Sequence, residues 1–183
     1  MDGLAAPADP GLGAVLGPSA AVALRDALRV RARRWASAVG GDRAYEATSV
    51  AAARAAVHGH RGPLLLAAPD VPGLDVALAM TALADLDAGC ALALGLTHDA
   101  RPYLIALSAL DDELIEIVEA GFGGGVLSAF SDTGRTIGLL RSERRLVSAA
   151  DARAFALDPL TPADLAVPLH ELRASRLGGN EDR

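Results

Sequence analysis

The chain has 183 residues, 51% of them hydrophobic, and a formal net charge of −6. This length and apolar content suffice for one domain with a substantial core, and the acidic balance argues against a broad nucleic-acid surface. All 17 basic residues are Arg. That composition excludes both a Walker A loop, which needs Lys on its phosphates, and Schiff-base chemistry on Lys.

Localisation and domain layout are predicted from the same features. No apolar run approaches the ~18 residues of a membrane span, and the acidic, Pro- and Gly-rich N-terminus does not resemble a signal peptide. The single Cys90 permits no disulfide framework. We therefore expect a cytoplasmic protein that binds no membrane, with a lead-in over 1–17, one α/β domain over 18–177 and a polar tail over 178–183.

The first predicted element is a helix over 18–38, where apolar residues recur every three or four positions. Its polar side carries four arginines: Arg25, Arg29, Arg33 and Arg34. A solvated face is the expected role of these arginines, and a phosphate-binding patch is the alternative. A short strand over 43–48 and a short helix from the N-cap Ser49 to about residue 57 come next. The following His58-Gly59-His60 is predicted to be a solvated loop rather than a metal site.

Strands and helices then alternate along the chain. Strands are predicted over 64–68, 90–96, 101–107, 137–140 and, as a short addition, 145–147. Helices are predicted over 75–87, 111–120 and 126–132, and a last helix begins with Pro162 at its first position. The flexible joint expected over 121–125 lies between two of these helices. This alternation predicts an α/β fold with a mostly parallel sheet in the middle of three layers.

Asp70 stands between Pro69 and Pro72, directly after the apolar run over 64–68. Neither proline can extend a strand ladder, and each restricts the residue before it, so the pair holds a turn. Ligands of such sheets bind beyond the carboxyl ends of the strands, which is where Asp70 is expected. The sequence leaves two roles open for Asp70: a cap of the turn or of the next helix, and a ligand-binding carboxylate.

Three segments together resemble a known family. These are PDVPGL at 69–74, DARPYLIAL at 99–107 and DPLTPADL at 158–165. They are similar, in order and position, to the TDCPxL, DGGYYLIGL and DxDTPxDL segments of an uncharacterised bacterial family (DUF2064) of glycosyltransferase-A-like proteins. The resemblance spans roughly residues 14–170 and implies a Rossmann-like GT-A fold, the fold of nucleotide-diphospho-sugar transferases, truncated at its N-terminus.

The resemblance also implies a chemistry. Transferases of this fold hold a nucleotide or nucleotide sugar through Mg²⁺ or Mn²⁺, which prefer hard oxygen ligands. By this resemblance Asp70 and Asp158 are the metal-ligand candidates. Asp99 is expected near the acceptor or the outer shell of the metal, and Arg101 is a candidate donor to a phosphate.

Departures from the family pattern argue against an intact nucleotide site. The family opens with a strand and a loop containing Lys, and this chain has neither at the corresponding place. Ala100 and Arg101 replace a glycine pair, and Leu160 replaces the second Asp of the late turn. We therefore expect a divergent protein with a degenerate nucleotide site that acts as a binding or partner module. The alternative is a metal-dependent nucleotidyl- or glycosyltransferase. A sheet edge left unpaired would favour a homo-oligomer.

Overall fold

The computed structural model of the chain describes residues 9–109, 111–121, 125–131, 133–170 and 172. These residues divide into two compact units. Unit 1 contains 32–68 and 73–143, and unit 2 contains 9–31, 69–72 and the residues from 144 onward. No helix in these ranges is long and apolar enough to cross a membrane.

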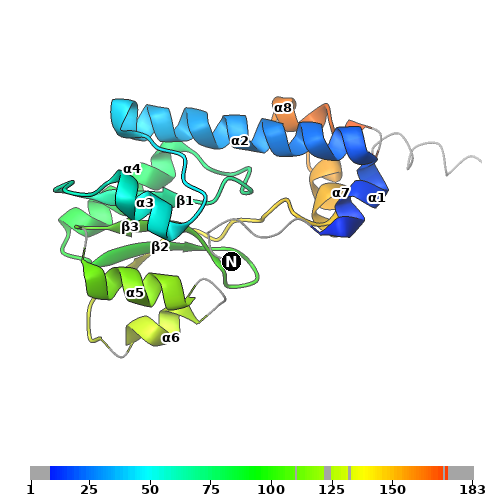
Figure 1. Cartoon of the computed structure of the whole chain (residues 1–183). Helices are drawn as coiled ribbons and strands as arrows, with labels where there is room; N and C mark the ends of the chain where they lie inside the picture. The colour runs from blue at the N-terminus through cyan, green and yellow to red at the C-terminus, as the bar shows by residue number, and fades with distance from the viewer. Residues whose placement is uncertain (1–8, 110, 122–124, 132, 171, 173–183) are drawn as a thin grey trace, which may run out of the picture. The chain divides into compact units, whose positions relative to one another are not determined.

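Unit 1 is built on a four-stranded sheet (Figure 1). Its strands are β1 (Leu64–Ala67), β2 (Leu92–Leu96), β3 (Pro102–Leu107) and β4 (Ile137–Leu139), arranged in the order β1-β3-β2-β4. Strand β3 runs antiparallel to β1 and β2, whereas β2 and β4 are parallel. It follows that β1, β2 and β4 share one direction, so their carboxyl ends lie at the same edge of the sheet.

This pairing corrects the expectation of a mostly parallel sheet. Only five residues, 97–101, connect β2 to β3. A parallel connection needs a crossover of a dozen or more residues, so this short link can only form a hairpin. The α/β class is confirmed, and the hairpin inserts one reversed strand between strands that share a direction.

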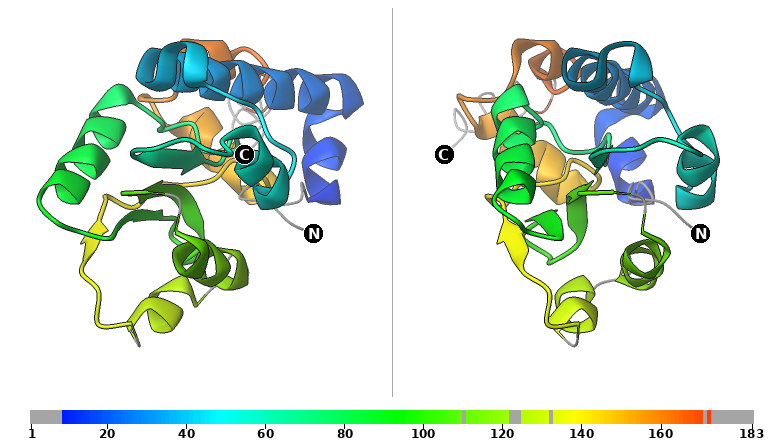
Figure 2. Two further views of the ribbon diagram at one scale, coloured as in Figure 1. Left: turned by 60° about the vertical axis from the view of Figure 1, so that its left-hand side comes forward. Right: turned by 90° about the vertical axis from the view of Figure 1, so that its left-hand side faces the viewer.

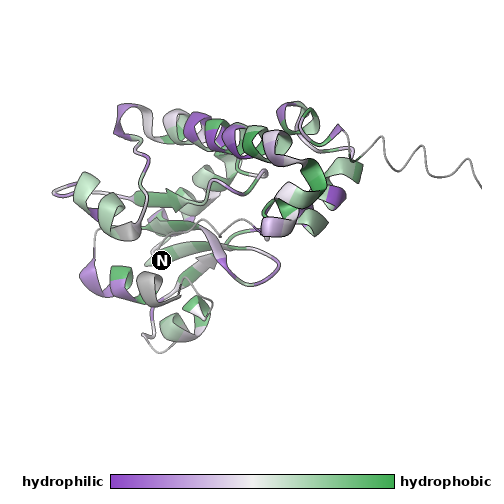
Figure 3. Cartoon of the chain, turned by 45° about the vertical axis from the view of Figure 1, so that its right-hand side comes forward, coloured by the Kyte–Doolittle hydropathy of each residue, from purple (hydrophilic) through white to green (hydrophobic). Residues whose placement is uncertain are grey.

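Helices cover both faces of the sheet, so the expected three layers are present in unit 1 (Figure 2). Helix α4 (Val76–Asp87) packs against β2, β3 and β4 on one face. Helices α5 (Asp112–Gly121) and α6 (Val126–Ser131) cover the other face through a cluster of buried side chains. That cluster consists of Leu92, Leu94, Ile105, Leu107, Leu114, Ile115, Val126 and Phe130. The strands are mostly green in Figure 3, and β3 is buried on both faces.

Unit 1 also holds the 3₁₀ turn η1 (Gly41–Arg43) and helix α3 (Val50–Ala56). The Ser49 side chain caps α3 by accepting a hydrogen bond from the amide of Ala52, as the sequence predicts. The strand expected over 43–48 is not formed. Most of that segment is exposed, so it has no apolar face to bury in a sheet.

Unit 2 is helical. Helix α1 (Pro10–Leu16), the first part of α2 (Pro18–Gly40), α7 (Ala149–Leu157) and α8 (Ala163–Ala166) contribute to one core. Its fully enclosed members include Leu24, Leu165 and Leu169. Residues 10–16 belong to the segment expected as a lead-in, yet they form a helix because Asp9 caps it and Leu12 and Leu16 are buried.

Two smaller expectations near this core need correction. Residues 145–147 are not a strand, because the amide of Leu146 bonds the Asp70 carbonyl instead of a strand ladder. Pro162 precedes α8 as its N-cap residue rather than lying at its first position.

Candidate functional site

Asp70 is buried in unit 2 and paired with Arg145. The Nη1 of Arg145 lies 2.7 Å from Oδ2 and 3.0 Å from Oδ1 of Asp70, and both residues are nearly inaccessible to solvent. The Asp70 carbonyl accepts a hydrogen bond from Leu146 at 2.8 Å, and Arg31 donates to the carbonyl of Pro72 at 3.1 Å. The turn between the two prolines is therefore held at its backbone and at its side chain.

Asp158 is exposed at the end of α7. Its Oδ1 accepts the amide of Leu160 at 2.8 Å, and its carbonyl accepts the amide of Thr161 at 3.1 Å, so it organises a turn. Among the described residues, no three His, Cys, Asp or Glu side chains are grouped as a cation would require. A divalent cation shared by Asp70 and Asp158 remains a prediction from sequence.

Asp99 and Arg101 come together in the hairpin between β2 and β3. The Nε of Arg101 lies 3.4 Å from Oδ2 of Asp99, and both side chains are largely exposed. The buried hydroxyl of Thr97 contacts the Asp99 carboxylate and accepts the amide of Arg101 at 3.2 Å. Ala100 adopts a φ of 61°, a left-handed conformation that suits glycine better than alanine.

A second polar cluster, which the sequence analysis missed, lies beyond the carboxyl end of β4. We define the Arg141 cluster as Asp75, Tyr103, Arg141 and Glu143. Arg141 donates from Nε to Oε1 of Glu143 at 2.6 Å and from Nη2 to Oδ2 of Asp75 at 2.9 Å. The hydroxyl of Tyr103 donates to the Arg141 carbonyl at 2.8 Å. The cluster thus ties the exit of β4 to β3 and to the N-cap of α4.

Glycines make room for this cluster. A Cβ on Gly73 would collide with the carboxylate of Glu143, and a Cβ on Gly95 would lie 2.6 Å from Cζ of the Tyr103 ring. Arg141 also donates from Nη2 to the carbonyl of Gly73 at 3.2 Å. In the sequence, Gly95 within an apolar strand is the feature that indicates a close approach of another group to the strand backbone, here of the Tyr103 ring.

The electrostatics of the Arg141 cluster favour its charged forms. Burial opposes ionisation of Asp75, yet the amide of Leu78 and the guanidinium of Arg141 outweigh it and hold the pKa of that carboxyl below its usual value. Bonds to Glu143 and Asp75 raise the pKa of Arg141. Burial, helped by the charge of Glu143, raises the pKa of Tyr103 well above its ordinary range. At neutral pH Asp75 and Arg141 are therefore both charged, and Tyr103 keeps its proton.

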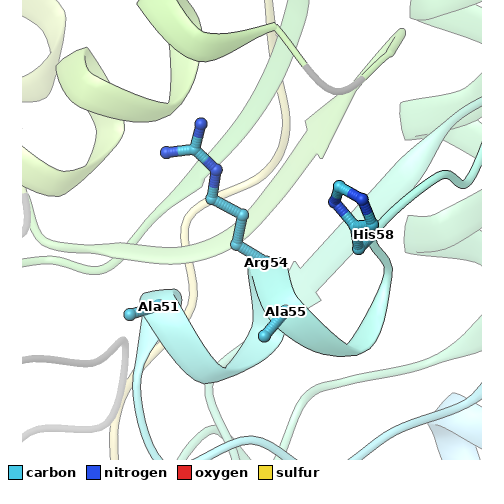
Figure 4. A pocket seen from close by; sticks show the side chains of 4 residues that line it. All are labelled: Ala51, Arg54, Ala55 and His58. Carbon is cyan, nitrogen blue, oxygen red and sulfur yellow. The ribbon is translucent and has the colours of Figure 1, made fainter.

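A separate open depression of about 680 Å³ is lined by Ala51, Arg54, Ala55 and His58 on and just after α3 (Figure 4). Arg54 forms an ion pair with Asp112 and so links α3 to the first residue of α5. None of the four residues that the sequence singled out for a transferase site lines the depression.

Comparisons with known proteins identify the fold. No protein-family model and no curated protein matches the chain. A solved structure from Desulfovibrio desulfuricans, assigned to the nucleotide-diphospho-sugar transferases, is similar with a TM-score of 0.67 and 14% identity, over 90% of this chain and 88% of that one. Molybdopterin-guanine dinucleotide biosynthesis protein A from Archaeoglobus fulgidus matches at a TM-score of 0.35 and 18% identity, over 69% of this chain and 63% of that one, which is too weak a likeness for an argument. The chain therefore has the α/β fold of nucleotide-diphospho-sugar transferases.

Proposed function

We propose that this chain is a divergent relative of the DUF2064 group whose nucleotide site has been altered, and that it acts as a binding or partner module without metal-dependent transfer. The likeness in fold supports the relationship but carries no activity by itself, since one fold hosts many functions. The proposal therefore depends on the chemistry of the residues at the strand ends.

The observation that carries the proposal is the ion pair between Asp70 and Arg145. Mg²⁺ and Mn²⁺ bind several hard oxygen ligands, and Asp70 is the main candidate ligand by resemblance. Both oxygens of Asp70 already contact one nitrogen of a buried guanidinium. A divalent cation at this carboxylate would have to displace that guanidinium and leave a positive charge buried beside it, which is strongly unfavourable.

The charged groups that follow β2 and β4 in unit 1 also argue against a nucleotide site. Arg101 is paired with Asp99, and Arg141 is shared between Asp75 and Glu143. Three carboxylates thus face two guanidinium groups. This balance disfavours a diphosphate unless a metal neutralises it, and the chain has no Lys to assist.

Calorimetric titration tests the proposal. The full chain is titrated with a panel of nucleotides and nucleotide sugars, each with Mn²⁺ and with a chelator, and Asp70→Asn and Asp158→Asn variants are titrated beside it. We expect no binding that depends on Mn²⁺. Mn²⁺-dependent binding that disappears in Asp70→Asn, from a variant that remains folded, would refute the proposal and support the metal-dependent transferase instead.

Self-association is part of the proposed partner role. Strand β1 is an edge strand of the described sheet, and within that sheet it pairs only with β3. Unpaired strand edges favour pairing with another chain. Light scattering on the purified chain over a range of concentrations would give a mass above 18.6 kDa if the edge pairs two copies, and the monomer mass throughout if it does not.

A further inference from the structure

Helix α2 carries an exposed surface that the proposed function does not use. We define the α2 stripe by six exposed residues: Val22, Arg25, Arg29, Val30, Arg33 and Arg34. Val22, Arg25, Arg29 and Arg33 are spaced by three or four positions and form one row along the helix, and Val30 and Arg34, four positions apart, form the row beside it. The opposite side carries the buried Leu24, Leu28 and Trp35. Purple, hydrophilic segments recur along α2 in Figure 3.

Arg31 shows how an arginine of this helix behaves when it serves the fold. Its Nη1 lies 2.9 Å and 3.1 Å from the two carboxylate oxygens of Asp164, and its Nη2 bonds the carbonyl of Pro72. About a quarter of its side chain (27%) is exposed. Arg31 thus links α2 to α8 and is not part of the stripe.

Arg25, Arg29 and Arg33 each contact a residue nearby and stay accessible. Arg25 donates to the carbonyl of Ala21 one turn back, Arg29 lies 3.6 Å from Asp26, and Arg33 donates to Glu46 at 2.8 Å. The side chains of Arg29 and Arg33 are nevertheless 54% and 60% exposed. The stripe thus presents four guanidinium groups on one exposed helix of a chain whose net charge is −6, with the carboxylates of Asp26 and Glu46 beside them.

This arrangement does not favour the isolated helix. Arg25, Arg29 and Arg33 follow one another at intervals of four, where like charges repel across one turn. Val22 and Val30 are 50% and 41% exposed, although β-branched residues are weaker helix formers than Ala. Exposed apolar residues beside a row of like charges are instead suited to contact with another molecule.

We propose that the α2 stripe docks an acidic amphipathic helix of a partner protein. Carboxylates one helical turn apart on that helix face Arg25, Arg29 and Arg33, and its small apolar side chains pack on Val22 and Val30. A second copy of α2 does not suit this surface, because it would set one row of arginines against another. A nucleic acid suits it less well, since the stripe contains no aromatic ring for stacking, and Val22 and Val30 offer a phosphate backbone no partner.

The probe for this proposal is a labelled, Ala-rich peptide of about 20 residues, long enough to form helix, with Glu at every fourth position and Leu along the neighbouring row. Its fluorescence anisotropy is followed as the full chain is added at ~50 mM salt, where charge attraction is weakly screened. A scrambled peptide of the same composition and a short DNA duplex are the comparison ligands. We expect the patterned peptide to bind more tightly than either.

Variants locate the binding surface. Arg25→Gln/Arg29→Gln/Arg33→Gln should weaken peptide binding by about tenfold or more, whereas Arg43→Gln/Arg61→Gln/Arg153→Gln, which removes the same charge from other exposed positions, should change it by less than about twofold. Replacing both valines, Val22→Ser/Val30→Ser, should weaken it by a smaller factor. Gln is a good helix former, and circular dichroism confirms that each variant keeps its helices.

Three results would overturn the proposal: equal binding of the patterned and scrambled peptides, equal loss in the two triple variants, or tighter binding of the duplex through the stripe. The test uses none of the residues of the nucleotide site. Its outcome is therefore independent of the calorimetric result for that site.

Discussion

Replacing Arg145 by Met is expected to destabilise the protein strongly. The Arg145 side chain is 6% exposed and that of Asp70 is 11% exposed, so little solvent screens the pair. The change removes the guanidinium 2.7 Å from the carboxylate and leaves Asp70 buried without that counter-charge. Breaking a buried ion pair from one side costs about 3–5 kcal/mol. This is a large share of the roughly 5–15 kcal/mol that stabilises a typical protein.

Urea denaturation followed by circular dichroism at neutral pH measures this loss. Thermal denaturation should agree, with a melting temperature lower by roughly 6–20 °C for a chain of this size. Arg144→Met is the matched control, because Arg144 is the neighbouring residue and is exposed. A surface change of this kind normally alters the free energy of unfolding by less than about 0.5 kcal/mol.

The double variant Asp70→Asn/Arg145→Met separates the ion pair from packing. Since it removes both charges, its loss should be smaller than the sum of the two single losses, as expected for a coupled pair. A loss below about 1 kcal/mol in Arg145→Met, similar to that in Arg144→Met, would refute the reasoning that the pair is desolvated and strong. The same result would weaken the case that Arg145 excludes a metal from Asp70.

Three further predictions concern unit 1. Gly95→Ala should lower the free energy of unfolding by about 1–3 kcal/mol in urea denaturation, because the added Cβ would lie 2.6 Å from the Tyr103 ring. The double variant Gly95→Ala/Tyr103→Leu should lose less than the sum of the two single losses, because the smaller Leu relieves the clash. Strictly additive losses would contradict the clash. Absorbance titration should show no ionisation of Tyr103, identified by difference from Tyr103→Phe, at about pH 10, where an ordinary Tyr is half ionised, since burial raises its pKa. The Arg135 guanidinium lowers the pKa of Asp111, so the stabilisation from this pair is complete above about pH 5 and is lost as the pH falls below about 4. Asp111→Asn should therefore flatten the pH dependence of the free energy of unfolding in that acid window, by about 0.5 kcal/mol for so exposed a pair, and an unchanged pH dependence in this variant would contradict the assignment.

Features set by neighbours in sequence were predictable. The apolar run at 64–68, the cap at Ser49 and the periodic pattern of α4 each specify an element through contacts within a few residues. The strand and helix order, together with three short motifs, was sufficient for the GT-A fold, which the structural likeness confirms. The direction of β3 differs from the prediction, although its cause is also local: the five residues over 97–101 are too few for a parallel crossover.

The partners of charged residues were not predictable. Asp70 and Arg145 are 75 positions apart, and Asp75 and Arg141 are 66 positions apart. Nothing in the local pattern around Arg145 or Arg141 distinguishes them from the exposed Arg144. By contrast Asp99 and Arg101 lie two residues apart in the turn between β2 and β3, and this turn is enough to bring them together.

By itself the sequence determined most of the elements, the α/β fold class and the exclusion of Lys chemistry, because composition and short-range periodicity act along the chain. The tertiary structure alone decided that Asp70 meets a guanidinium and that Arg141 is shared by two carboxylates. The physical reason is that the state of a charged group depends on its burial and on the charges around it, and both are created only when distant segments pack together.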